Sequence, residues 1–309
     1  MLEGFDLGKP LGASPEDIFW YWIKERHAIY LKREAGHGRP WTDDPILQTY
    51  RFCNPFREND KVTRWQREHF TGPNEEHASD EVLAFNLVWF RMFNRIETAD
   101  LLGFQYRWDP EWVKSTLRTR AKTGHPVFTG AYNIRSEFGK PKIDSIVDTL
   151  TRVWNARHEL VTCIQETNSL ELTTRYLMRF PFIGDFMGYE MVSDMRHTRL
   201  LENAVDIYTW ANPGPGAYRG LRRMFGEPKL RKDGQVEQYL VRTKMVGLMQ
   251  ELLARSHAML GPEFPLLEMR DIEHSLCEYD KYSRVKNLEG RPRQKYAGGG
   301  EGNLPSSGA

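Results

Sequence analysis

Apolar residues recur at steps of three and four positions along most of the chain, which is the period of an amphipathic α-helix. The strict alternation of apolar and polar residues that marks a half-buried strand is scarce. The clearest stretch follows Ser79 and runs toward Gly103, and it places its apolar side chains on one face of an expected helix over 80–102. This pattern predicts an all-α fold.

Capping residues indicate where several of these helices begin and end. Ser14 precedes Pro15 and two acidic residues, which is the arrangement of a helix N-terminus. Asp109 starts another helix, which Gly124 can end in a left-handed cap. Apolar periodicity predicts further helices over about 143–154, 170–178, 235–260 and 270–284.

The helical pattern fits one domain-sized stretch followed by a tail. We expect a helical domain over residues 1–286, either single or divided into two helical lobes with a cleft between them, and a flexible tail over 287–309. The longest apolar runs fall well short of the roughly 20 residues that a membrane span needs. The first ten residues lack the apolar core of a secretory signal. We therefore expect a cytoplasmic protein with no membrane partner.

Charge and absent motifs exclude several functions. Basic residues number 43 and acidic residues 42, so nucleic-acid binding would have to come from local patches. The chain has no phosphate-binding Gly-x-x-x-x-Gly-Lys-Ser/Thr sequence, so it is not itself a P-loop kinase. Cys53, Cys163 and Cys277 lie too far apart in sequence to suggest a metal or iron–sulfur site. We predict no metal and no cofactor.

A first candidate site follows the expected 170–178 helix. The sequence from Arg179 to Tyr189 resembles a helix-hairpin-helix, in which backbone N–H groups at a helix N-terminus approach a DNA phosphate, and Gly184 and Gly188 are its candidate DNA-binding residues. Phe182 occupies the place of the first expected glycine. Asp185 occupies the place where lyase-type DNA glycosylases carry a lysine, which excludes Schiff-base chemistry there. The alternative is an ordinary corner between two helices.

A second candidate site is a loop rich in glycine and proline over 210–221. Its glycines are expected to leave backbone exposed, a geometry suited to a phosphate or base. Basic residues follow, and together these side chains and glycines form a candidate DNA surface, for which a solvated basic helix face is the alternative. Its candidate residues are Gly214, Gly216, Arg219, Arg222 and Arg223.

A third candidate site runs from Arg51 to Trp65. Arg57 and Arg64 recur with a lysine at helical spacing, and a cluster of guanidinium groups is what a phosphoryl or pyrophosphoryl group requires. Asp60, set among these cations, would stay ionised and could accept a proton or neutralise an arginine.

A second set of polar residues is Arg91, Asn94 and Glu97, whose spacing predicts that they share one polar face of the 80–102 helix. A fourth block contains Glu278 and Lys281, which could be only a surface pair.

Taken in this order, the blocks resemble the alpha-glutamyl/putrescinyl-thymine pyrophosphorylase group, also called amino acid:DNA transferases. The resemblance covers about residues 45–285, and it includes Arg-Phe-Cys-Asn-Pro-Phe-Arg from Arg51, Trp-Phe-Arg-Met-Phe-Asn-Arg from Trp89 and Glu-x-Asp-Lys-Tyr from Glu278. It implies an all-α, DNA glycosylase-like helical fold. A similar helical domain is fused to 5-hydroxymethyluracil DNA kinases in some phages.

The implied reaction replaces the pyrophosphate of 5-(pyrophosphoryloxymethyl)uracil in double-stranded phage DNA by an amine, from an amino acid or a polyamine. Arginines would neutralise the departing pyrophosphate, and the candidates are Arg51, Arg57, Arg64 and Arg91. Asp60 or Asp206 would take the proton of the amine, with Asp194 as the less favoured choice, or Asp206 would hold the flipped base. The candidate substrate-pocket residues are Asn54, Asn94, Glu97, Glu278 and Lys281.

Two alternatives remain open at this point. A DNA glycosylase would use an aspartate to break the N-glycosidic bond of a modified pyrimidine. A non-catalytic DNA-binding module would position a separate 5-hydroxymethyluracil DNA kinase. The expected partners are therefore DNA with modified thymine, a small amine donor and, as a candidate, that kinase, all in the host cytoplasm if a phage encodes the chain.

Overall fold

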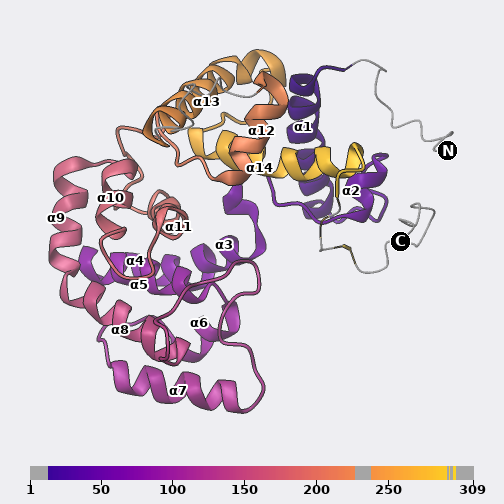
Figure 1. The fold of residues 1–309 in the computed structure, drawn as a ribbon. Helices are drawn as coiled ribbons and strands as arrows, with labels where there is room; N and C mark the ends of the chain where they lie inside the picture. Colours follow the sequence, from indigo (N-terminus) through magenta and orange to yellow (C-terminus); the bar gives the residue numbers. More distant parts are fainter. Residues whose placement is uncertain (1–12, 227–237, 291, 293–294, 297–309) are drawn as a thin grey trace. The chain divides into compact units, whose positions relative to one another are not determined.

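The structure is a computed structural model that describes residues 13–226, 238–290, 292 and 295–296. Regular secondary structure in this part of the chain is helical, which confirms the all-α prediction, and the only β-type pairing described there is an isolated bridge between Tyr50 and Lys295 (Figure 1). Contacts within the chain group into two compact units, Met1–Arg57 with Pro213–Ala309, and Glu58–Asn212.

The second unit is built around helix α5, Asp80–Phe93. Every side chain from Leu83 to Phe93 is buried, because α8, α9 and α11 all pack on this helix. The sequence predicted an apolar stripe on one face, whereas the helix is enclosed on all sides. The other helices of the unit are α3 Lys61–Trp65, α4 Gly72–Glu75, α6 Ile96–Leu102, α7 Pro110–Lys122, α8 Lys142–Asn155, α9 Arg157–Thr167, α10 Leu170–Leu177 and α11 Asp185–Met195.

The expected 80–102 helix is broken at Asn94. This residue has a φ of 45° and a ψ of 48°, the left-handed conformation that commonly ends a helix, and α6 starts two residues later. The apolar period continues through Ile96, so periodicity alone gives no sign of the break. Arg91, Asn94 and Glu97 therefore do not share one polar face, and that prediction is wrong.

Helices α10 and α11 are consecutive and pack against each other. Phe182 in their connection has a φ of 63°, a conformation that glycine adopts more readily than phenylalanine. Gly188 lies against α10, since a Cβ atom there would come within 3.3 Å of the Thr174 carbonyl oxygen. Gly184 is the exposed residue before the first turn of α11. The predicted helix over 170–178 is confirmed as α10.

The first unit is organised around α14, Met269–Lys286, most of which is buried. Helices α1 (Pro15–Glu34), α2 (Pro45–Thr49), α12 (Pro215–Phe225) and α13 (Gln238–Leu260) all contact it. Ser14 caps α1 as predicted, accepting a hydrogen bond from the Asp17 backbone. Asp44 caps α2 and also accepts hydrogen bonds from the hydroxyls of Tyr21 and Tyr282, so this carboxylate links three elements of the unit.

Two glycines set the close approach of α12 to α14. A Cβ atom at Gly216 would lie 2.3 Å from the Cys277 Sγ atom, and one at Gly220 would lie 2.5 Å from the Leu276 carbonyl oxygen. Both glycines are buried on the same side of α12, four residues apart. The expectation that the backbone at Gly216 is exposed is therefore wrong, because a neighbouring helix covers it.

The predicted starts of α7, α8, α10 and α14 agree with the structure to within a few residues. Helix α13 ends at Leu260 as predicted, and residues 235–237 of its predicted range lie outside the described residues. Helix α9 and helix α12 were not predicted as separate helices. The predicted tail over 287–309 falls largely on residues 291, 293–294 and 297–309, which lie outside the described residues. Among the residues described, no helix combines the length and the hydropathy needed to cross a bilayer.

Candidate functional site

The first unit joins two of the sequence blocks, the loop over 51–57 and helix α14. The backbone N–H of Cys53 donates a hydrogen bond of 3.1 Å to the Glu278 carboxylate, across 225 positions of sequence. The other carboxylate oxygen of Glu278 accepts a hydrogen bond of 2.6 Å from the Lys281 ammonium group. Only 4% of the Glu278 side chain is exposed, so this is a sheltered pair rather than a solvated surface pair. On the N-terminal side, Arg26 of α1 donates a hydrogen bond to the Phe52 carbonyl oxygen. The loop is therefore held by α1 as well as by α14.

The charge of Lys281 is stabilised in this position. Burial disfavours its protonated form, but attraction to Glu278 and their hydrogen bond outweigh that effect, so the pKa of Lys281 is raised. The ammonium group also lies 5.8 Å from the centre of the Phe52 ring. Glu278 and Lys281 therefore hold a fixed cation next to the 51–57 loop.

His274 lies one turn before Glu278 on α14, in the same cationic environment. Burial lowers the pKa of its imidazole well below the ordinary value, and the charges of Arg57, Lys281 and Arg270 lower it further. Its buried Nε2 atom has no hydrogen-bond partner among the described residues. Burial and these three cations therefore favour the neutral form of the His274 imidazole.

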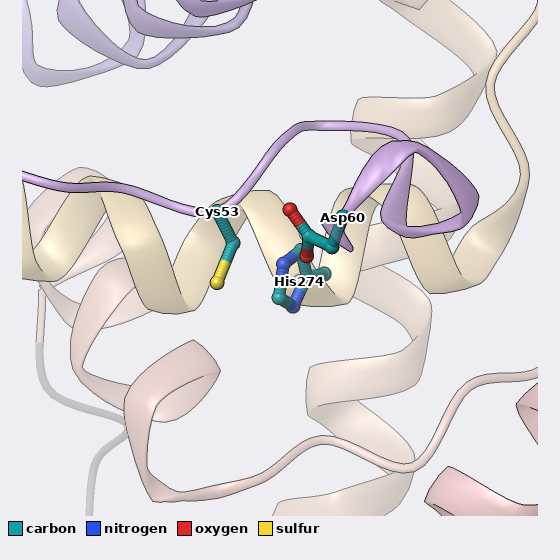
Figure 2. Close-up of side chains that lie close together, drawn as sticks. All are labelled: Cys53, Asp60 and His274. Carbon is teal, nitrogen blue, oxygen red and sulfur yellow. The ribbon is translucent and has the colours of Figure 1, made fainter. Parts of the chain in front are cut away.

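Figure 2 labels three side chains, namely Cys53 from the loop, His274 from α14, and Asp60, which belongs to the second unit. The Cys53 Sγ atom and a ring nitrogen of His274 lie within 4.8 Å of each other.

The remaining predicted residues of this loop differ in exposure. Asn54 is 6% exposed, whereas Arg51 is exposed, with its guanidinium 5.6 Å from the centre of the Tyr296 ring. The loop therefore presents both sheltered and solvent-facing polar groups.

Asp280, on the same helix, orients the arginines of α12. Its carboxylate is fully buried and accepts hydrogen bonds from Nε of Arg219 at 2.8 Å and Nε of Arg223 at 2.9 Å. Arg223 also pairs with Glu289 at 2.5 Å. Arg219, Arg222 and Arg223 line a pocket of about 360 Å³ together with Asp280. Because Asp280 binds Arg219 through Nε, the terminal nitrogens of that half-exposed guanidinium can face a ligand.

In the second unit, Arg91 and Asp194 form a buried ion pair. The Arg91 guanidinium donates two hydrogen bonds of 2.5 Å to the carboxylate, one of 2.9 Å to Asn94 and one of 3.0 Å to Thr63. Burial works against the charge of Arg91, but the attraction and hydrogen bonds of Asp194 prevail and raise the pKa of the guanidinium. The structure thus brings together Arg91, Asn94 and Asp194. Glu97 is separate from them, more than half exposed and paired with Arg95.

Asp206 holds the N-terminus of α10. Its carboxylate accepts hydrogen bonds from the Ser169 hydroxyl at 2.7 Å and from the backbone N–H groups of Leu170 at 2.8 Å and Glu171 at 3.0 Å. Carboxylates are favoured at this end of a helix because they match its dipole. Each oxygen of Asp206 is therefore already bonded in the folded chain.

Asp60 and Arg64 lie where the second unit begins. Asp60 is the residue before α3 and is partly exposed, and its side chain makes no capping hydrogen bond to that helix. Arg64 is 3.9 Å from Glu68, on the π-helical turn η2 (Gln66–Thr71) that follows α3. Arg57 belongs to a different, 3-10 turn, so the predicted continuous helical spacing of Arg57 with Arg64 is wrong.

Three residues of the first unit had no role predicted from the sequence: His274, Arg270 and Asp280. The spacing of His274, Glu278 and Lys281, four and three positions apart, places all three on one face of a helix and could have indicated His274. The role of Asp280 had no such signal, because its arginine partners lie about 60 residues earlier in the chain.

Comparison with known proteins identifies a family whose sequence model this chain matches. Residues 14–291 match the family described as "5-hmdU DNA kinase, helical domain". The chain is also 26% identical over 297 residues to a 5-hmdU DNA kinase of Bacillus phage SP10, a match that covers 88% of this chain and 45% of that kinase. The chain thus spans less than half the length of that relative. No solved structure matches the chain significantly.

Proposed function

The chain belongs to the family of the helical domain of 5-hmdU DNA kinases, and from this premise we propose that it is an enzyme of thymine hypermodification in phage DNA. The proposed reaction replaces the pyrophosphate of 5-(pyrophosphoryloxymethyl)uracil by an amine. The kinase relative carries 5-hmdU in its name, and the proposed substrate is a phosphorylated derivative of the same base.

The observation that carries this proposal is a group of basic side chains beside the 51–57 loop, in which Lys281 is paired with Glu278 and Arg270 with Glu268. Arg57, Arg270 and Lys281 all act electrostatically on one imidazole there. A plain damaged base would need no such charge, whereas a pyrophosphate leaves an exocyclic methylene group only if its negative charge is neutralised. Arg51, on the same loop, extends the proposed pyrophosphate site, and Asn54, Glu278 and Lys281 are its proposed pocket residues.

The second unit would supply the DNA contacts of the hairpin. The exposed Gly184 backbone at the start of α11 is suited to a phosphate, and the positive φ of Phe182 supports a hairpin in which glycine is the usual residue. We extend this to a helix-hairpin-helix within a DNA glycosylase-like fold. Base extrusion would then give the enzyme access to the 5-methylene group. Gly188 and Gly216 would act through helix packing, not through contact with DNA.

The candidate carboxylates and arginines of this unit divide into two groups. Asp60 keeps its place as a candidate proton acceptor, and Arg64 keeps its proposed role as a pyrophosphate ligand. Arg91, Asp194 and Asp206 are fully engaged with groups of the folded chain, so we propose positioning roles for them. Asn94 would act with Arg91, and Glu97 is a proposed substrate-facing residue on an exposed surface.

The family match favours a second candidate, a DNA-binding module without chemistry of its own that presents 5-hydroxymethyluracil to a kinase. In this case the basic residues of the first unit would contact DNA phosphates only. A DNA glycosylase is the third possibility kept from the sequence, and the cationic cluster disfavours it.

One experiment separates these functions. The full chain is incubated with duplex DNA that contains 5-(pyrophosphoryloxymethyl)uracil and with glycine, glutamate or putrescine, and the nucleosides are analysed by mass spectrometry. We expect an amine adduct and released pyrophosphate. An abasic site would instead identify a glycosylase. Unchanged nucleosides, with DNA binding retained, would support the kinase-associated module and exclude the transferase.

Substitution of Arg57 tests the pyrophosphate site directly. We expect Arg57→Ala to lower kcat/KM by about 100-fold, because it removes a charge that would stabilise the departing pyrophosphate. The change is measured by adduct formation under single-turnover conditions, with circular dichroism to establish folding. Asp60→Asn would lower turnover similarly if Asp60, the aspartate predicted from the sequence, is the proton acceptor. The control is Arg255→Ala, which removes an exposed arginine of α13. If Arg57→Ala forms adduct as fast as Arg255→Ala does, Arg57 is not a pyrophosphate ligand.

Substitution of Arg222 tests the DNA surface of α12. We expect Arg222→Ala to weaken binding to any DNA sequence and to reduce the slope of log K against log salt by about 1, because one phosphate contact is lost. Arg223 is unsuitable for this test, since it is bonded to both Asp280 and Glu289. Fluorescence anisotropy between low and moderate salt measures the slope. An unchanged slope would place Arg222 outside the DNA contact.

A further inference from the structure

We propose that His274 accepts the proton of the incoming amine in the pyrophosphate displacement, an inference that rests on the proposed function. The sequence offered only aspartates for this task. Asp206 is occupied by the N-terminus of α10, and Asp194 by Arg91. Within the first unit, His274 is a proton acceptor of a different kind, a neutral base rather than a carboxylate.

The position of His274 is suited to this role. Its Nε2 atom is buried, has no hydrogen-bond partner among the described residues, and so keeps its acceptor or donor capacity available. The cations of the first unit that act on the ring are Arg57, Arg270 and Lys281. Glu278 accepts a hydrogen bond from Lys281, and Glu268 and Asp271 lie within ion-pair distance of Arg270. The Cys53 thiol is within 4.8 Å of a ring nitrogen (Figure 2). A small polar substrate group that reaches the ring would therefore meet an Nε2 atom that has no hydrogen-bond partner among the described residues.

The surrounding cations couple proton acceptance to substrate charge. They disfavour a proton on the imidazole of the free protein, and they are also the groups with which a pyrophosphate would pair. A bound pyrophosphate neutralises them, so the proton affinity of His274 increases when the substrate is present. The base is thus activated by the leaving group that it helps to displace.

The reaction balances in two steps. The bound ammonium group of the donor gives one proton to a ring nitrogen of His274, which frees the nitrogen lone pair. This lone pair forms the C–N bond to the exocyclic methylene carbon while the C–O bond breaks, and the pyrophosphate oxygen leaves with the electron pair. The imidazolium then returns its proton to solvent as pyrophosphate departs. No oxidant, reductant or further reactant is required.

The first test measures the imidazole in the wild-type chain, and a variant serves only to assign the signal of His274. Nitrogen NMR of histidine-labelled protein is recorded across pH with and without inorganic pyrophosphate, and the His274 signal is assigned from its absence in His274→Gln. We expect saturating pyrophosphate to raise the pKa of His274 by one or more pH units. An unchanged His274 titration at saturation would overturn the proposal.

The second test measures catalysis. We expect His274→Gln and His274→Asn to lower kcat at least 100-fold with KM for DNA within about threefold of wild type, and imidazole in the buffer to restore part of the activity of His274→Ala. His257→Gln, an exposed histidine of α13, is the control and should react as wild type. If wild-type protein forms no adduct, the proposed function fails and this inference with it. If wild type forms the adduct and His274→Gln keeps its kcat, the inference alone fails and Asp60 becomes the base.

Discussion

Replacement of Asp194 by alanine is expected to lower the free energy of unfolding of the second unit by about 3–5 kcal/mol, because it leaves the buried guanidinium of Arg91 without its counter-charge. Arg91 is 2% exposed, so water cannot replace the carboxylate without opening the packing around α5. Loss of a proton does not relieve the problem, since arginine stays charged in proteins. Urea unfolding followed by tryptophan fluorescence and circular dichroism measures the change.

A surface pair of the same unit supplies the control. Glu97→Ala removes the partner of Arg95, but more than half of the Glu97 side chain is exposed, and such pairs contribute about 0–1 kcal/mol. The double variant Arg91→Met with Asp194→Leu should recover much of the lost stability, because no buried charge remains. Stability of Asp194→Ala within 1 kcal/mol of wild type would mean that the guanidinium reaches solvent, and would restore Arg91 as a direct pyrophosphate ligand.

The elements that were predicted well depend on neighbours in sequence. The Ser14 cap and the Asp109 cap each accept a hydrogen bond from a backbone N–H three residues later, so a short window contains the whole interaction. The break at Asn94 escaped prediction although it is also local. Apolar residues continue across it with helical spacing, and the left-handed turn leaves the pattern of burial nearly unchanged.

The candidate site shows a different limit. The sequence identified the loop over 51–57 and the pair Glu278 and Lys281, but nothing in it indicated that the Cys53 N–H bonds to Glu278. The same holds for Gly216, which was interpreted as backbone exposed to a phosphate. Whether a glycine faces solvent or a neighbouring helix depends on the partner surface, which for Gly216 is Cys277 on α14. Residue type suggested the candidate residues, whereas their contacts depend on long-range packing.

Conversion of Asp206 to alanine tests whether a candidate catalytic carboxylate is instead structural. We expect the free energy of unfolding to decrease by about 2–4 kcal/mol, because three hydrogen bonds to one carboxylate are lost and the donors at the start of α10 are left without it. Urea unfolding measures this loss. Ser79→Ala removes a single neutral cap from α5 and should cost less, about 1 kcal/mol.

The conservative variant Asp206→Asn separates structure from chemistry. Its amide oxygen can still accept hydrogen bonds from the α10 backbone, but it cannot take a proton from an amine. If Asp206 is a cap, folded Asp206→Asn keeps a kcat near that of wild type and loses only part of the stability. If Asp206 were the base, the same variant would be stable and inactive, because proton acceptance requires the carboxylate. Adduct formation at a temperature well below the unfolding transition distinguishes the two outcomes, and on the hydrogen bonds of Asp206 we expect the first.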